Sequence, residues 1–313
     1  MRYLLAVILL AGQNAPEYTR ETPRPGLPLA FRGGLLLVGR GDPARVVLED
    51  REGRAVGEYE FRPPGAESAR LRVTAAALDA AGRPVTAAVA LDMQRQRAEN
   101  LIFFHDDRAG TKTGGFSCQA VAARGQDEAW CLGAWTDRAE GDHAARQLLY
   151  RVSRAGEVMG VYPLPRSADE RTPEGLSRFP ALGLPAIWSS EDGSVWAWLP
   201  GDRKVVRYRA ESGRLEAWDV PLPKGGPAGV SVAVTPDSRV LALLPVSQDG
   251  WRVAPGPSPV FAVFRLDLQS GAWTKVEGLP VFKRGVRLIG AEGRSIVIED
   301  REAARLEWWR AAP

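Results

Sequence analysis

A hairpin that recurs along the chain constrains the fold more than any other sequence feature. Its clearest copy, VVRYRAESGRLEAWDVP at 205–221, has two alternating strands around a turn that contains glycine. Further copies occupy 46–61, 101–116, 148–165 and 261–280, and the turn glycines are Gly53, Gly110, Gly156, Gly213 and Gly271. Glycine adopts the positive φ of such turns without a Cβ clash. A period near 50 residues with strand-type alternation predicts a β-propeller rather than a helical solenoid.

A second hairpin precedes each of these copies, at 73–91, 118–135, 185–200, 229–246 and 286–300. Two hairpins in each repeat supply the four strands of a propeller blade. We therefore predict an all-β fold, a six-bladed β-propeller of four-stranded antiparallel blades that forms one domain over 16–313. The last copy of the repeat, at 295–310, has room after its first turn for only two more strands, so the last blade lacks its outermost strand. We expect the N-terminal segment EYTRET, at 17–22, to supply this strand and close the ring, which removes the exposed edges.

The N-terminal 1–15 segment resembles a secretory signal. It has one early positive charge at Arg2 and an apolar run from Tyr3 to Ala11, which is too short to span a bilayer. We expect a signal peptide and a secreted or periplasmic mature protein without a transmembrane span. The alternative is a buried N-terminal strand in a cytosolic protein.

Two cysteines, Cys118 and Cys131, flank the turn of one hairpin almost symmetrically. Such placement would put them opposite each other in adjacent antiparallel strands, with Cα atoms about 4.5–5.5 Å apart. A disulfide would suit an oxidising compartment, and the alternative is a pair of small buried thiols. Two cysteines without a nearby histidine pair cannot complete a tetrahedral zinc site, so no metal is expected here. We also expect no cofactor.

The long connections between strands are the main indication of function. Polar stretches at 92–100, 136–147 and 247–259 join the second and third strands of blades two, three and five, and 166–178 connects two blades. In a propeller all of these emerge on one face, and long loops on a rigid scaffold often bind ligands. The candidate binding residues are Arg95, Arg97, Arg138, Asp142, His143, Arg146, Trp251 and Arg252. This Arg-rich rim would suit a protein partner or a small anionic or sugar-like ligand, and the alternative is a set of solvated loops.

Charge and motif content narrow the function further. The 41 basic and 38 acidic residues give a net charge of +3, which argues against nucleic acid as the main partner. The sequence contains no nucleophile elbow, phosphate-binding loop, haem-attachment motif or EF-hand loop. His105 is expected to be structural, because Asp50 and Asp267 occupy matching polar positions in other blades. We assign no catalytic residue and expect a non-enzymatic binding module.

The tryptophans support a packed propeller. Nine of them fall on expected strands, where aromatic side chains usually pack between neighbouring blades. They are Trp130, Trp135, Trp188, Trp196, Trp198, Trp218, Trp273, Trp308 and Trp309.

Blade four carries a family resemblance. It has a DGSVW hairpin at 192–196, followed by a strand, a glycine turn and a second strand that ends at Pro221. This pattern resembles the repeats of propellers related to virginiamycin B lyase, the NHL-like propellers and the sensor-kinase propellers. The resemblance implies the fold. The lyase chemistry of that family relies on histidines and a glutamate around a central metal, and this chain offers only His105 and His143. The alternative functions are therefore a lyase-type or lactonase-type enzyme with a metal in the central channel, or a structural subunit of an envelope or extracellular assembly.

Overall fold

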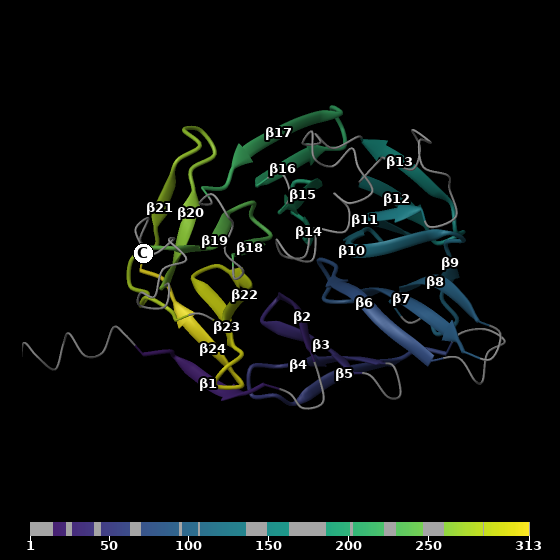
Figure 1. The fold of residues 1–313 in the computed structure, drawn as a ribbon, viewed down its shortest axis with the longest axis horizontal. Helices are drawn as coiled ribbons and strands as arrows, with labels where there is room; N and C mark the ends of the chain where they lie inside the picture. Colours follow the sequence, from purple (N-terminus) through teal and green to yellow (C-terminus); the bar gives the residue numbers. More distant parts are fainter. Residues whose placement is uncertain are drawn as a thin grey trace, which may run out of the picture.

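The chain forms a ring of six four-stranded antiparallel sheets, as seen in the computed structural model (Figure 1). The structure describes residues 15–22, 27–40, 45–62, 70–93, 96–105, 107–135, 149–162, 186–200, 203–221, 230–246, 260–283 and 285–312. Within these ranges all regular structure is β-strand, and no helix long and apolar enough to cross a membrane is found. The predicted six-bladed β-propeller is confirmed.

Each blade is built from strands that are consecutive in the chain, except the last. Blade one contains β2 (Leu27–Arg32), β3 (Leu35–Arg40), β4 (Arg45–Glu49) and β5 (Ala55–Glu60). Blade two contains β6 (Arg70–Leu78), β7 (Pro84–Asp92), β8 (Arg97–Phe104) and β9 (Thr111–Lys112). Blade three contains β10 (Phe116–Arg124), β11 (Glu128–Trp135), β12 (Leu149–Ser153) and β13 (Val158–Tyr162). Blade four contains β14 (Ala186–Ser189), β15 (Ser194–Leu199), β16 (Lys204–Arg209) and β17 (Arg214–Asp219). Blade five contains β18 (Ser231–Val234), β19 (Val240–Pro245), β20 (Phe261–Leu266) and β21 (Trp273–Lys275). Blade six contains β22 (Val286–Glu292), β23 (Ser295–Asp300), β24 (Arg305–Arg310) and β1 (Tyr18–Glu21).

The ring closes as predicted, because β1 is the outermost strand of blade six. It pairs antiparallel with β24, with Tyr18 opposite Trp308 and Glu21 opposite Arg305 (Figure 1). At the two ends of β1, the N–H of Glu17 donates to the Trp308 carbonyl and the N–H of Thr22 donates to the Ala304 carbonyl, each at 2.8 Å. The first and last described strands therefore stabilise each other.

A buried carboxylate also attaches β1 to blade one. Arg20 Nη2 lies 2.9 Å from Glu49 Oε2, and Arg40 Nη2 lies 2.9 Å from Glu49 Oε1. The guanidinium of Arg20 sits over the β4–β5 turn, where Gly53 has a φ of 85°. A Cβ at this glycine would lie 2.3 Å from Arg20 Nη1. The turn therefore needs glycine both for its backbone and for the close approach of Arg20.

The core lies between neighbouring blades. For example, Ile102 and Phe104 of blade two pack in one cluster with Val121, Tyr150 and Val152 of blade three. Because both faces of a blade are covered, its middle strands are continuous apolar runs. All six residues of β15 are buried, whereas the outer strand β17 has partly buried and exposed positions.

The tryptophans largely confirm the predicted core packing. All nine lie on strands, and five are buried with exposed fractions of 5% or less: Trp130, Trp196, Trp198, Trp308 and Trp309. Trp188 differs, because it lies on the innermost strand of blade four and is only partly buried.

The predicted polar excursion at 92–100 is wrong, because most of it belongs to a β-ladder. Asp92 pairs directly with Arg97, and the ladder continues through Ala90 opposite Glu99. The three inner strands of blade two, β6, β7 and β8, are eight or nine residues long, and the first two residues of β8 are exposed. Exposed strand ends carry polar residues, which made this segment resemble a loop. Phe116, expected to end blade two, instead begins β10 of blade three.

The predicted pairing of the two cysteines is also wrong. Cys131 lies opposite Val121, and Cys118 lies opposite Gly133. The turn is centred closer to Cys131 than the sequence symmetry suggested, and β10 bulges between Cys118 and Ala120. Both residues are buried and carry free thiols, which is the alternative that the sequence left open. Burial raises the pKa of the Cys131 thiol well above its ordinary value, and the adjacent Cys118 raises it further.

Candidate functional site

The propeller has two distinct faces. Every blade begins with its innermost strand. The six inner strands therefore run in the same direction along the central axis of the ring (Figure 1); they are β2, β6, β10, β14, β18 and β22. We call the face where these strands begin the loop face, because the connections between blades and between second and third strands emerge there. We call the opposite face the turn face, because the short hairpin turns, including that of Gly53, lie there.

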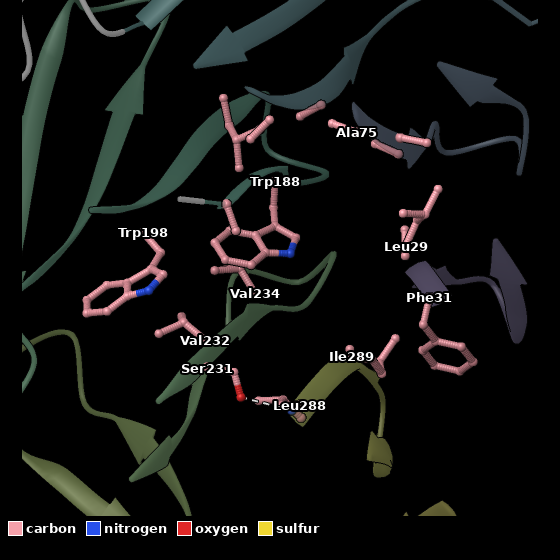
Figure 2. Close-up of a pocket in the computed structure, with 18 of the residues that line it drawn as sticks. Leu29, Phe31, Ala75, Trp188, Trp198, Ser231, Val232, Val234, Leu288 and Ile289 are labelled. Atoms are coloured by element: carbon pink, nitrogen blue, oxygen red, sulfur yellow. Dashed lines mark hydrogen bonds between the residues drawn. The ribbon is translucent and has the colours of Figure 1, made fainter. Parts of the chain in front are cut away.

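A central cavity of about 470 Å³ lies between the six inner strands, and every one of them contributes to its wall. Figure 2 shows Leu29, Trp188, Val232 and Ile289 arranged around this space. Most lining side chains are aliphatic or aromatic. The cavity is therefore an apolar site formed by the rigid part of the ring.

A recurring β-bulge shapes the wall of the cavity. In four blades the ladder between the first and second strands shifts by one residue, and the extra residue is Leu29, Thr74, Gln119 or Ile289. All four line the cavity. A bulge leaves its extra residue unpaired in the ladder and re-aims its side chain. The bulges therefore place two apolar and two polar side chains in the wall.

Hydroxyl groups in the wall serve mainly to join blades. Thr74 Oγ1 lies 3.1 Å from the carbonyl oxygens of Ala87 and Cys118, which joins blade two to blade three. Ser231 Oγ accepts a 2.8 Å hydrogen bond from the N–H of Leu288, as Figure 2 shows. These hydroxyls are used by the scaffold, and among the described residues the side-chain amide of Gln119 has no hydrogen-bond partner.

Arg32 stands at the turn-face end of the cavity, where β2 enters the turn at Gly33. Its Nη1 donates to the carbonyl of Leu78 in blade two at 3.5 Å. The same nitrogen donates at 3.3 Å to the carbonyl of Ser189, in the blade that lies across the ring. Arg32 forms no ion pair with any described residue. Its Nε and Nη2 likewise donate to no atom within the described ranges.

A second cationic group stands toward the loop face. Arg287, on β22, donates from Nε to Glu299 Oε2 at 3.0 Å, and Arg301 donates from its own Nε to the same oxygen at 3.2 Å. Burial lowers the pKa of the Arg287 guanidinium, although the charge of Glu299 acts in the opposite direction. Two arginines therefore share one carboxylate here, and the local charge is positive.

The described lining residues do not fit a channel metal of the lyase type. The charged groups among them are Arg32, Arg287 and Arg301, and the wall contains no histidine, cysteine or carboxylate. Over the whole of the described chain, no cluster of three or more potential metal ligands is present. His105 follows β8, away from the cavity wall, and its Nε2 lies 4.0 Å from Asp79 Oδ2. The alternative function, a lyase-type or lactonase-type enzyme with a metal in the central channel, therefore has no set of metal ligands among the described lining residues.

Of the binding residues expected from the sequence, the structure describes only Arg97. It is exposed at the start of β8, on the loop face. The others lie outside the described residues: Arg95, Arg138, Asp142, His143, Arg146, Trp251 and Arg252. The cavity itself was missed by sequence reasoning. The only sequence signal for it is an arginine immediately before a Gly-Gly turn, at Arg32, in an otherwise apolar inner strand.

Comparison with known proteins supports the fold and assigns no activity. No family model and no curated protein matches the sequence. A solved protein of unknown function from Bacteroides thetaiotaomicron aligns with 96% of this chain and 73% of its own, at 11% identity and a TM-score of 0.50. A member of the DUF4221 family from Bacteroides vulgatus aligns with 95% of this chain and 97% of its own, at 9% identity and a TM-score of 0.50.

Virginiamycin B lyase from Staphylococcus aureus is also among the similar structures, as the resemblance of blade four predicted. It aligns with 93% of this chain and 97% of its own, at 11% identity and a TM-score of 0.46. At such low identities the likeness concerns the fold alone. The sheet topology makes this chain a six-bladed β-propeller, and the solved structures of similar fold include the DUF4221 family member.

Proposed function

We propose that this chain is an exported, non-enzymatic propeller that docks a partner at its loop face. The supporting observation is the unequal length of the connections on the two faces. β11 ends at Trp135 and β12 begins at Leu149, while β19 ends at Pro245 and β20 begins at Phe261. Both connections attach at the loop face, whereas the turn face has short hairpin turns. Long connections on a rigid scaffold commonly carry binding residues.

The long connections at the loop face carry charges of both signs. Asp137, Glu140, Asp142 and Asp249 lie in them beside three arginines. The two long connections contain Arg138, Arg146 and Arg252, together with one aromatic residue, Trp251. Arg97 is exposed at the same face, at the start of β8. Arginine and tryptophan are the residue types that most often dominate binding energy at protein interfaces. A protein partner with a polar surface of mixed charge would match this composition.

Export remains part of the proposal and rests on the apolar N-terminal segment 1–15. N-terminal sequencing of the protein purified from cell fractions tests it. Recovery of a shortened chain outside the cytoplasm would support export, and recovery of the intact N-terminus in the cytoplasm would contradict it.

Affinity capture from envelope and secreted fractions tests the docking surface. The loop-face variant carries Arg138→Ala, Arg146→Ala, Trp251→Ala and Arg252→Ala. A matched turn-face variant carries Arg54→Ala and Arg214→Ala, whose side chains are 75% and 70% exposed. We expect the wild type and the turn-face variant to capture the same macromolecule and the loop-face variant to lose it. Equal capture by both variants, or no capture by the wild type, would contradict the proposal.

A further inference from the structure

The central cavity has the size and composition of a small-molecule site. Its volume of about 470 Å³ lies within the roughly 300–1,000 Å³ that is usual for ligand pockets. Its wall consists of strands that are hydrogen-bonded on one side to the rest of each blade, so the cavity exists without any rearrangement of loops. Trp188 packs against the buried cluster that contains Val234, and Leu29 lies on the other side of the cavity (Figure 2). The body of a matching ligand is therefore apolar.

The electrostatics of the cavity select the charge of the ligand. Among the described residues, the three charged side chains that line the cavity are all arginines, and Arg287 and Arg301 share the carboxylate of Glu299. A cleft of one charge sign with apolar walls concentrates counter-ions of the opposite sign. This arrangement attracts an anion and repels a cation.

Arg32 supplies a binding geometry for that anion. Within the described part of the chain, its contacts to the scaffold are those of Nη1 with the carbonyls of Leu78 and Ser189. The edge formed by Nε and Nη2 donates to no described residue, and Arg32 is only partly buried. The nearby carboxylate of Glu292 accepts instead from the N–H of Gly34 at 3.0 Å. A guanidinium edge of this kind matches a carboxylate through two parallel hydrogen bonds.

We infer that the central cavity binds a small apolar carboxylate, with the acid group on the free edge of Arg32 and the hydrocarbon body against Leu29, Trp188 and Val232. This site is independent of the loop-face docking proposed above, because it uses none of the same residues. The two carbonyl contacts of Arg32, one of them from the opposite blade, hold the guanidinium in place before the ligand arrives. Such preorganisation reduces the cost of ordering the site on binding.

Three ten-carbon probes that differ only in their head group test the charge selection: decanoate, decanol and decylammonium. Isothermal titration calorimetry on the full chain measures each affinity. We expect saturable 1:1 binding of decanoate, weaker binding of decanol and no detectable binding of decylammonium. Equal affinities for decanoate and decylammonium, or non-saturable binding of decanoate, would overturn the inference.

Two variants test the placement. Arg32→Gln should weaken decanoate binding by about tenfold to a hundredfold, because a hydrogen-bonded ion pair is lost, while decanol binding should stay unchanged. The control Arg214→Gln, at an exposed turn-face arginine, should leave decanoate binding unchanged. Unchanged decanoate affinity in Arg32→Gln would refute the role of Arg32.

Gln119→Trp provides a test that does not depend on Arg32. This bulge residue lines the cavity and has no hydrogen-bond partner among the described residues, so its replacement fills the space without breaking a contact. It should abolish binding of both decanoate and decanol, with thermal unfolding as the check that the ring is intact. Retained decanoate binding in a folded Gln119→Trp variant would place the ligand elsewhere and overturn the inference.

Discussion

The closure of the ring should depend on the buried carboxylate of Glu49, and the change Glu49→Gln tests this. The Glu49 side chain is only 4% exposed and lies between Arg20 of the closing strand and Arg40 of blade one, each at 2.9 Å. Glutamine keeps the size of the side chain but removes its charge. The two arginine side chains, 12% and 23% exposed, would then face each other without a counter-ion.

The size of the effect follows from this burial. Removing one partner of a buried ion pair costs about 3–5 kcal/mol, whereas removing one from an exposed pair costs about 1 kcal/mol or less. Because the arginines retain partial contact with solvent, we expect Glu49→Gln to lower the free energy of unfolding by about 3 kcal/mol, at the lower end of the buried range. For a domain larger than 250 residues this corresponds to a fall in Tm of about 6 °C, at about 2 °C per kcal/mol.

A double-mutant cycle separates the energy of the Arg20–Glu49 ion pair from the other contacts of these two residues. Arg20→Met, Glu49→Gln and the double variant are compared by urea unfolding, and we expect a coupling energy of about 1–3 kcal/mol between the two sites. The control is Arg310→Met, which removes the exposed partner of Glu17, the residue before β1, and should cost about 0.5 kcal/mol or less. A coupling energy below about 0.5 kcal/mol would show that the Arg20–Glu49 pair does not hold the ring closed.

Three further predictions follow from the packing. Gly133→Ala should destabilise the protein by about 1–3 kcal/mol in urea unfolding, because the new Cβ would lie 2.1 Å from the Ser117 carbonyl oxygen. Gly57→Ala, on an outer strand, is the control and should have little effect. Equal costs for the two substitutions would contradict the steric argument. Arg207 lowers the pKa of Glu216 below its ordinary 4.5, despite the opposing effect of burial. The stability that the Arg207–Glu216 ion pair provides is present above about pH 4.5 and is lost as the pH falls through the pKa of Glu216 in the folded protein. The unfolding free energies of wild type and Glu216→Gln should therefore converge between about pH 6 and about pH 3. A constant difference over this range would refute the stabilising role of the ion pair. Because both cysteines are buried free thiols, they should resist a thiol reagent in the native protein and react with it after denaturation without a reductant. A lack of reaction in denaturant would show that they form a disulfide.

The repeat itself determined the fold. Turn glycines such as Gly53 and Gly213, with apolar alternation on both sides, define the strands locally, because a positive φ and a period of two depend only on neighbouring residues. Counting strands then predicted the pairing of the N-terminal segment with blade six. That prediction succeeded because an unpaired edge is unfavourable in any closed ring, whatever the side chains are.

The errors arose where the register of a ladder decides which residues meet. A bulge at Gln119 and an off-centre turn separated Cys118 from Cys131 along the ladder, and a one-residue shift is invisible in an apolar alternation. The polar residues after Asp92 resembled a loop because the exposed end of a strand is as solvated as a loop.

The central cavity was decided only by the tertiary structure. Arg32, Trp188 and Ile289 belong to different blades, and no local pattern connects residues that are more than 100 positions apart. They face one space because six inner strands surround one axis and bulges re-aim the residues between them. The sequence by itself therefore determined which segments become strands and how many blades they form. Closure of the ring decided which side chains share the cavity, because that proximity exists only when all six blades are in place.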